Sequence, residues 1–360
     1  MRLQHVGIEV KDLYAVELFY RRVLGFALRY RYVSRNTPGL RTVFLEREGV
    51  QLELLERPRG PEFEASRQAA GPHLALEVAD VDAEHARLAG LGFPGVVVKP
   101  PRNTGDGFRE LALTDPEGNV VELATRIGPE PRYPVRAVLF DLDGTLIDSE
   151  PNYFETDRLL LERRGVPFTE EDKRRYIGWA NVEQMQDMIR RYGLTETVEA
   201  LTVEKTQTYL EIAVRQTRIF PEMKRLWDLV RGRGMPVAVA SGSGRKVLDR
   251  LLEVVGFARE ARVVVSTDEV SRGKPAPDVF LEAARRLGVP PEECVVVEDS
   301  RFGVQAAQRG FMRCIAVPYL HDKPLDDAFL MADLLFEDGM DGFDALRALE
   351  WLDAQNDRRG

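Results

Sequence analysis

The first 126 residues repeat one sequence pattern, and this duplication restricts the fold more than any other feature. Four positions recur 68 residues later: His5, Glu9, Val10 and Asp12 become His73, Glu77, Val78 and Asp80. Further matches, at offsets of 67 and 69, are Gly25-Phe26 with Gly92-Phe93, and Gly49 and Glu53 with Gly118 and Glu122. Each copy reads as a strand, a helix and then several strands. A duplicated βαβββ unit is the simplest account, because repeated supersecondary units stack to bury a shared core.

A proline-rich segment separates this repeat from the rest of the chain. Residues 126–134 contain three prolines and one glycine, and prolines stiffen a connector into an extended spacer. At 360 residues the chain is also longer than one hydrophobic core usually covers. We therefore expect a first domain at 1–128, a linker at 129–135 and a second domain at 136–350.

The second domain alternates apolar strands with helical patterns. Continuous apolar runs occur at residues 137–140, 237–240, 263–265 and 295–297, and each later run is followed by turn residues and a helical pattern. Such runs are typical of a parallel sheet that is covered on both faces. Residues from about 150 to about 217 are charged and amphipathic, which predicts a helical insertion after the first strand.

Polar residues follow several of these strands. Asp141 and Asp143 come directly after the first strand, and residues two apart on a strand share a face. Ser241 and the pair Glu298-Asp299 follow two later strands, and Lys274 lies in a Gly-Lys-Pro turn. Because the carboxyl ends of parallel strands meet at one edge of the sheet, these groups are expected to converge there.

Such a set suits phosphoryl transfer to an aspartate. A carboxylate can attack phosphorus only where cations and fixed donors neutralise the dianionic phosphate. We assign Asp141 as nucleophile, Asp143 as the group that protonates the leaving alkoxide, and Ser241 and Lys274 as phosphoryl-binding groups. Mg²⁺ prefers oxygen ligands, which Asp141, the Asp143 backbone and Asp299, with Glu298 nearby, could supply.

Asp141-Leu-Asp-Gly-Thr, Ser241, Lys274 and Glu298-Asp299, in this order, resemble the four signature motifs of the haloacid dehalogenase superfamily. The insertion after the first motif resembles the cap of the subfamily that contains phosphoglycolate-type phosphatases and β-phosphoglucomutase. The resemblance implies a Rossmann-like sheet with a helical cap, and an Mg²⁺-dependent phosphatase or phosphomutase for a small phosphorylated molecule. Dehalogenation is disfavoured, since those family members generally lack the second aspartate, present here as Asp143.

Two departures from the mutase pattern favour hydrolysis. Mutases of this kind carry a histidine in the hinge after the first motif, whereas residues 148–153 contain none. The lysine expected soon after the second-motif serine is absent from residues 242–244. A phosphatase is therefore the main prediction and a phosphomutase the alternative. Residues 177–183 of the insertion either face the substrate, as the family's specificity loop does, or pack as an ordinary helix start.

The repeat also places two histidines and two glutamates at equivalent positions, namely His5, His73, Glu53 and Glu122. If the copies pair about a local two-fold axis, these side chains form a symmetric divalent metal site. Residues 1–126 resemble the glyoxalase and vicinal-oxygen-chelate superfamily, from His5-Val-Gly-Ile-Glu-Val to Asp115-Pro-Glu-Gly-Asn-Val-Val-Glu122. The resemblance implies Zn, Ni, Co, Mn or Fe and a lyase or isomerase step by proton transfer next to a carbonyl.

Another role is open to this domain, because duplicated folds of this kind also serve as metal-free binding modules. In that case only the phosphatase is active, and the N-terminal domain binds a ligand or forms a homodimer. The site could close within one chain or between two.

The composition excludes several classes of partner. A net charge of −9 and a pI near 5.3 argue against nucleic acid and anionic membranes. The two cysteines, Cys294 and Cys314, lie in apolar stretches, as expected of buried thiols in a reducing compartment. With neither a signal-peptide core nor a membrane-span pattern, the expected location is the cytoplasm.

Overall fold

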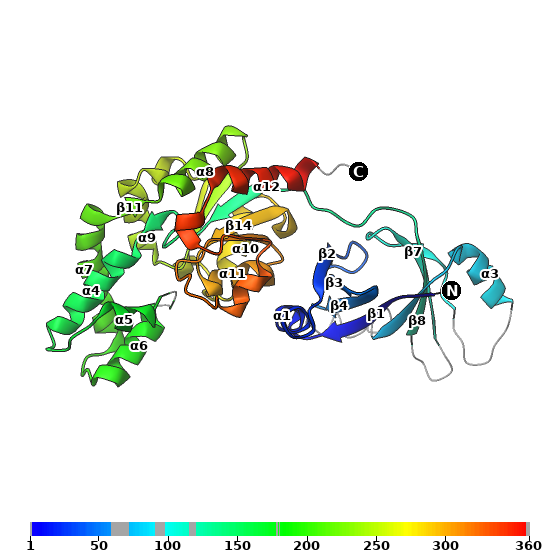
Figure 1. The fold of residues 1–360 in the computed structure, drawn as a ribbon, viewed down its shortest axis with the longest axis horizontal. Coiled ribbons are helices and arrows are strands. Elements are labelled where there is room, and N and C mark those ends of the chain that lie inside the picture. Colours follow the sequence, from blue (N-terminus) through cyan, green and yellow to red (C-terminus); the bar gives the residue numbers. More distant parts are fainter. Residues whose placement is uncertain are drawn as a thin grey trace. The chain divides into compact units, whose positions relative to one another are not determined.

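The computed structural model describes residues 2–58, 72–90, 98–114, 120–177, 179 and 181–357. These residues divide into two compact units, Met1–Arg132 and Tyr133–Gly360 (Figure 1). Two parts of the expected repeat, Gly92-Phe93 and Gly118, lie outside the described residues.

The N-terminal unit is built from two βαβββ copies that share one eight-stranded sheet. The first copy comprises β1 Arg2–Val10, α1 Leu13–Leu24, β2 Ala27–Val33, β3 Arg41–Arg47 and β4 Val50–Glu56. The second comprises β5 His73–Glu77, α3 Val81–Ala89, β6 Arg102–Asn103, β7 Phe108–Thr114 and β8 Val120–Arg126. The strand order is β2-β3-β4-β1-β5-β8-β7-β6, so the copies meet at their first strands. The predicted duplication is confirmed.

The repeated aspartates start the two equivalent helices. Asp12 accepts a hydrogen bond from Ala15 N, and Asp80 accepts from Asp82 N and Ala83 N. Each carboxylate thereby satisfies backbone donors that a helix N-terminus leaves free. The repeated sequence thus fixes where each helix leaves the sheet.

Strand pairing in the N-terminal unit brings the repeated histidines together. β1 and β5 are antiparallel neighbours with Gly7 opposite His73, and the bulge between Leu3 and His5 lies on β1. β4 runs parallel to β1, with Glu53 opposite Gly7, and β8 runs parallel to β5, with Glu122 opposite Ala75. The four predicted ligands therefore come from the four central strands.

The C-terminal unit contains a six-stranded sheet in the order β13-β12-β9-β14-β15-β16, and all of its neighbouring strands are parallel. Its strands are β9 Ala137–Phe140, β12 Val237–Ser241, β13 Val263–Ser266, β14 Cys294–Glu298, β15 Arg313–Ala316 and β16 Leu334–Leu335. Its helices are α8 Pro221–Gly232, α9 Arg245–Val254, α10 Asp278–Leu287, α11 Arg301–Arg309 and α12 Ala345–Asp357. α12 continues beyond the expected domain end at residue 350.

Helices cover both faces of this sheet (Figure 1). Apolar residues of α8, α9 and α12 pack with Val138 and Phe140 of β9 in one core cluster. α10 contacts β9, β12 and β13, and α11 contacts β14 and β15. Because successive strand residues point to opposite faces, burial on both faces explains the continuous apolar runs. The predicted parallel α/β sheet is confirmed.

The helical insertion follows β9 and has its own core. It comprises α4 Glu150–Glu162, α5 Glu170–Arg174, α6 Asn181–Tyr192 and α7 Val198–Gln216. Leu160, Phe168 and Tyr176 belong to a separate cluster of buried residues within it. The chain enters through β10 Ile147–Asp148 and leaves through β11 Arg218–Ile219, and these strands pair antiparallel. We call these four helices the cap.

Candidate functional site

Three neighbouring strands carry the predicted serine and carboxylates of the C-terminal unit at their carboxyl ends. β12, β9 and β14 are adjacent in the sheet, and Ser241, Asp141 and Glu298 lie at their carboxyl ends. All three residues are buried. The structure thus brings together groups that are far apart in sequence, as parallel pairing requires.

Lys274 lies between two carboxylates. Its Nζ donates to Asp141 Oδ1 and, at 2.5 Å, to Glu298 Oε1. The other Glu298 oxygen accepts from the backbone N of Ser300 at 2.8 Å and from its hydroxyl at 3.0 Å. Both oxygens of Glu298 are therefore engaged by protein donors, and the residue holds the ammonium group against Asp141.

Burial controls the charge of these groups. Burial raises the pKa of Asp141 well above its usual range; Lys274 opposes this shift, while Glu298 and Asp143 add to it. Burial alone would lower the pKa of Lys274, but Asp141 and Glu298 raise it overall. Burial raises the pKa of Asp299 as well, with Glu298 and Asp141 adding to it. Crowded carboxylates of this kind call for a further positive charge.

Asp143 points toward two serines instead of Lys274. Its Oδ2 accepts from Ser243 Oγ at 2.7 Å and from Ser241 Oγ at 3.2 Å. Ser243 Oγ also lies 3.1 Å from the hydroxyl of Tyr153, a residue of α4 in the cap. Ser243 and Tyr153 were not among the predicted site residues, because a serine in a glycine-rich turn and a tyrosine in a helix carry no chemical signature.

Glycines make room for the acidic groups. Gly144 has a φ of +81°, and a Cβ placed there would lie 2.4 Å from Asp299 Oδ2. A Cβ on Gly303 would lie 1.8 Å from the carboxyl group of Glu298. Asp299 Oδ1 accepts from Thr145 Oγ1 at 3.0 Å. Position 144, in the turn after β9, and position 303, in α11, therefore require glycine because any side chain there would collide with these carboxyl groups.

A cavity of about 130 Å³ opens over these groups and is lined by both the core and the cap. From the core it is lined by Asp141, Asp143, Ser243, Lys274, Glu298 and Asp299, among others. From the cap it is lined by Glu150, Tyr153, Lys173, Tyr176, Trp179, Asn181, Gln184 and Lys205. Of the expected substrate-facing stretch 177–183, Trp179 and Asn181 thus reach the cavity, and Gly178 and Ala180 lie outside the described residues.

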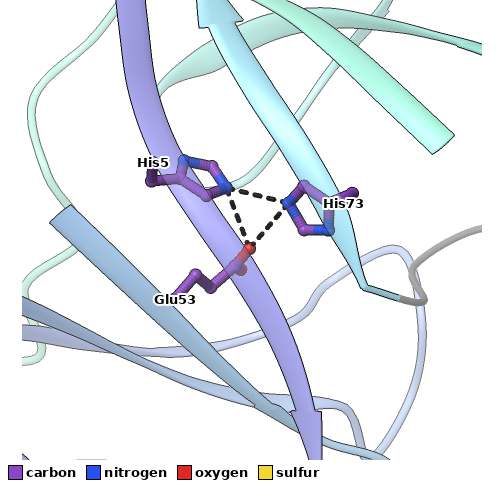
Figure 2. Close-up of side chains that lie close together, drawn as sticks. All are labelled: His5, Glu53 and His73. Carbon is purple, nitrogen blue, oxygen red and sulfur yellow. Dashed lines mark hydrogen bonds and ion pairs between the residues drawn. The ribbon is translucent and has the colours of Figure 1, made fainter. Parts of the chain in front are cut away.

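The N-terminal unit brings His5, Glu53 and His73 into a triangle (Figure 2). The two Nε2 atoms are 2.9 Å apart, and Glu53 Oε2 lies 3.1 Å from His5 Nε2 and 3.3 Å from His73 Nε2. Neighbouring ligands of a metal bound at about 2.0–2.2 Å are themselves about 2.9–3.5 Å apart. The three residues therefore fit a divalent metal ion, and all three are buried.

Surrounding residues hold this triangle in place. His5 Nδ1 lies 2.6 Å from Gln4 Oε1, which orients the ring through the nitrogen that faces away from the triangle. A Cβ on Gly7 would lie 2.1 Å from the His73 ring, so only glycine fits on β1 opposite this histidine. The His-x-Gly spacing on β1 is thus explained by the close approach of His73.

The fourth predicted ligand, Glu122, lies beside this triangle. Its Oε2 is 3.5 Å from His73 Nε2. Burial raises the pKa of Glu122, whereas for Glu53 hydrogen bonds from both histidines overcome burial and lower the pKa to about 2. The set is therefore asymmetric, although its residues occupy equivalent positions of the repeat.

A second cavity, of about 70 Å³, lies over this triangle. Besides the four predicted residues it is lined by Arg102, Asp106 and Glu110, among others. Burial, with the negative charge of Glu122, raises the pKa of Glu110 to about 8. Sequence reasoning missed these residues, because they lie in the second copy without a counterpart among the repeated positions.

The structure also bears on the predicted buried cysteines and on membrane-spanning helices. Cys294 and Cys314 are both buried, as the sequence predicts. Among the described residues, the helices are all too short or too polar to cross a membrane.

Comparisons with known proteins support both resemblances. Residues 135–310 match the sequence model of the haloacid dehalogenase-like hydrolases. Residues 2–123 match that of the Glyoxalase/Bleomycin resistance protein/Dioxygenase superfamily.

Individual relatives align with about half of this chain, and two of them are named as phosphatases. The bifunctional riboflavin kinase/FMN phosphatase of Arabidopsis thaliana is 34% identical over 184 residues, which are 51% of this chain and 48% of that protein. This chain therefore spans about half the length of that relative. Fructose-1-phosphate phosphatase YqaB of Escherichia coli is 33% identical over 186 residues, 51% of this chain and 96% of that protein. The crystal structure of CbbY from Rhodobacter sphaeroides in complex with phosphate aligns with a TM-score of 0.50 and 26% identity, over 58% of this chain and 98% of that one.

Proposed function

The chain belongs to the haloacid dehalogenase-like hydrolases, and from this premise we propose that it is an Mg²⁺-dependent phosphatase of a small phosphorylated metabolite. The observation that carries the proposal is the convergence of Asp141, Lys274 and the Asp143–Ser241 pair around one cavity. The substrate of YqaB, fructose 1-phosphate by its name, suggests that sugar phosphates are the first class to test.

The proposed reaction has two steps at Asp141. Its carboxylate attacks phosphorus, the bond from phosphorus to the ester oxygen breaks, and Asp143 gives a proton to the leaving alkoxide. Water then attacks the aspartyl phosphate while Asp143 takes its proton, which releases phosphate and restores Asp141. Lys274 and Ser241 would bind the phosphoryl oxygens in both steps.

The buried carboxylates fit a magnesium ion. We assign Asp141, Asp299 and the backbone carbonyl of Asp143 as its ligands, because both oxygens of Glu298 already accept hydrogen bonds. When bound, Mg²⁺ would neutralise the charge of the phosphoryl group and of the nearby carboxylates. Glu298 would then act by positioning Lys274.

Hydrolysis is proposed over phosphoryl transfer to a second substrate. The hinge residues 148–153 contain no histidine, and the cap residue that meets the second-motif loop is Tyr153, through Ser243. Burial raises the pKa of Tyr153 well above its usual range, with Asp143 adding to the shift, so this hydroxyl stays protonated and is a poor proton acceptor at neutral pH. A phosphomutase remains the alternative.

The test is phosphate release from a panel of small phosphorylated sugars with Mg²⁺. Asp141→Asn is close in shape and removes the nucleophile, so turnover should be lost. Asp249→Asn on α9 is the matched control, since Asp249 lies on the surface and pairs with Arg245. Turnover that persists in Asp141→Asn would refute the aspartyl-phosphate route.

For the N-terminal unit we propose a divalent metal centre held by His5, Glu53 and His73, with Glu122 as a further ligand. The mutual distances of 2.9–3.3 Å among the three ligand atoms favour this over a metal-free module. When bound, the metal would polarise a substrate oxygen. A lyase or isomerase step then belongs to this unit, and a ligand-binding or dimerisation role is the alternative.

Metal content decides this second proposal independently of any catalysis. The purified chain, loaded with Zn²⁺, Ni²⁺, Co²⁺, Mn²⁺ or Fe²⁺ and then desalted, should retain one ion that Glu53→Gln loses. Glu48→Gln is the control, because Glu48 is exposed at the turn before β4. A wild-type chain that retains none of these ions would point to a metal-free binding module.

A further inference from the structure

The cap side of the C-terminal cavity contains a buried network of charged groups. Asp157 of α4 is fully buried, and its carboxylate lies 2.9 Å from Lys205 Nζ and 3.3 Å from Lys173 Nζ. Gln184 donates to the same carboxylate at 2.7 Å and accepts from Lys205 at 2.5 Å. Lys173 Nζ also lies 3.5 Å from Glu150 Oε2. Except for Asp157, each of these residues lines the cavity.

The charges of this network cancel. Two ammonium groups face two carboxylates, Asp157 and Glu150, and among the described residues of the cap no further charged side chain lines the cavity. Burial raises the pKa of Glu150, although Lys173 opposes this shift. Burial also lowers the pKa of Lys205, although Asp157 opposes it. These two shifts act in opposite directions on net charge. The cap therefore offers no surplus positive charge to a second anionic group.

The network nevertheless offers hydrogen bonds to a ligand. Each lysine ammonium has three donors. Lys205 donates one hydrogen bond to Gln184 and forms an ion pair with Asp157, and Lys173 donates one to Asp157 and lies 3.5 Å from Glu150. Glu150 Oε2 is a buried acceptor without a hydrogen bond among the described residues. A donor and an acceptor side by side match a hydroxyl group, which both donates and accepts.

An aromatic surface completes the arrangement. The ring of Tyr153 lies 5.2 Å from Lys173 Nζ and 5.6 Å from Lys205 Nζ, and Trp179 lines the same cavity. Rings of this kind pack against the C–H faces of a carbon skeleton, while the polar groups address its hydroxyls.

We propose that the cap selects substrates whose leaving group is a neutral polyhydroxylated molecule, and discriminates against those that carry a second phosphate or a carboxylate. This rests on the proposed phosphatase function. A second anion would have to enter next to Glu150, where the two lysines are already balanced by Glu150 and Asp157, and an unpaired buried charge is strongly unfavourable. Glu150 and Lys173 are the specificity-determining residues.

The experiment compares kcat/KM for matched pairs of substrates. The pairs are fructose 1-phosphate with fructose 1,6-bisphosphate, and glycerol 3-phosphate with 3-phosphoglycerate. Wild-type protein should favour the member of each pair whose leaving group is uncharged by at least about tenfold, since a charged leaving group would be buried without a counter-charge.

Two variants change the charge balance in opposite directions. Glu150→Gln leaves the lysines in excess, so the ratio should move toward the second anion by about tenfold. Lys173→Met leaves the carboxylates in excess, so the ratio should move further toward the substrate with the uncharged leaving group. Glu155→Gln is the matched control on the same helix, because Glu155 pairs with Arg158; it should leave the ratio unchanged.

The outcomes separate this proposal from the proposed function. Phosphate release that depends on Asp141 but favours the bisphosphate or the phosphoglycerate would overturn the proposal and leave the phosphatase standing. Ratios that do not move in either variant would also overturn it. Loss of the proposed function itself would appear as no Asp141-dependent phosphate release from any member of the panel.

Discussion

Ser243 provides the sharpest test of how Asp143 is held. Ser243 Oγ donates to Asp143 Oδ2 at 2.7 Å, which is the shorter of the two serine contacts to this carboxylate. A hydrogen bond to a charged group contributes about 1.5–3 kcal/mol. At about 1.4 kcal/mol for each factor of ten, Ser243→Ala should lower kcat for a sugar phosphate by about 10- to 100-fold.

The choice of substrate separates positioning from general damage. A sugar alkoxide needs the proton that Asp143 would supply, whereas p-nitrophenolate leaves without one. We therefore expect the first step with p-nitrophenyl phosphate, measured as the first-turnover release of p-nitrophenol, to stay within about threefold of wild type in Ser243→Ala, whereas the second step needs Asp143 with either substrate. Tyr153→Phe removes only the hydroxyl 3.1 Å from Ser243 Oγ. It should also lower the rate for the sugar phosphate more than that for p-nitrophenyl phosphate, by a smaller factor than Ser243→Ala.

The assay is the first-turnover release of the alcohol or phenol from each substrate, beside steady-state kcat for the sugar phosphate, with thermal unfolding as a check that the variants are folded. Equal losses of the first-turnover rate on both substrates would mean that Ser243 acts structurally. An unchanged kcat for the sugar phosphate would refute the assignment of Asp143 as the proton donor held by Ser243.

Three further predictions follow from packing and charge. Gly7→Ala should abolish metal retention by the N-terminal unit, because its Cβ would lie 2.1 Å from the His73 ring; metal content measures this, and normal retention would contradict the proposed geometry. Asp157→Asn should destabilise the C-terminal unit by about 3–5 kcal/mol, because it leaves buried Lys205 without its counter-charge; urea unfolding measures this, and a loss below about 1 kcal/mol would contradict it. Chelation with EDTA should stop phosphate release and added Mg²⁺ should restore it, and turnover in EDTA would argue against a magnesium site.

The asymmetry of the N-terminal set shows a limit of repeat analysis. Equivalent positions predict a symmetric site, yet Glu53 contacts both histidines whereas Glu122 lies 3.5 Å from His73. The two copies have different neighbours: Arg102 and Glu110 of the second copy are hydrogen-bonded to each other, and the negative charge of Glu122 acts on Glu110. Equivalence in sequence fixes which strand a residue occupies, but not the charges around it.

Both fold classes could be predicted from the chain itself, because strand alternation, apolar runs and the spacing of the repeat are local properties. The same holds for Asp141 and Lys274, whose residue types and order suit one chemistry. The roles of Ser243, Tyr153 and Lys173 could not be found in this way, since ordinary polar residues gain a role only from what packs against them. Contacts between segments far apart in sequence decide which carboxylate can bind a metal and which one binds a lysine instead, as Glu298 does. The sequence alone determined the strands and the reacting groups; the tertiary structure decided their partners, because hydrogen bonds and burial depend on distances that only the folded chain sets.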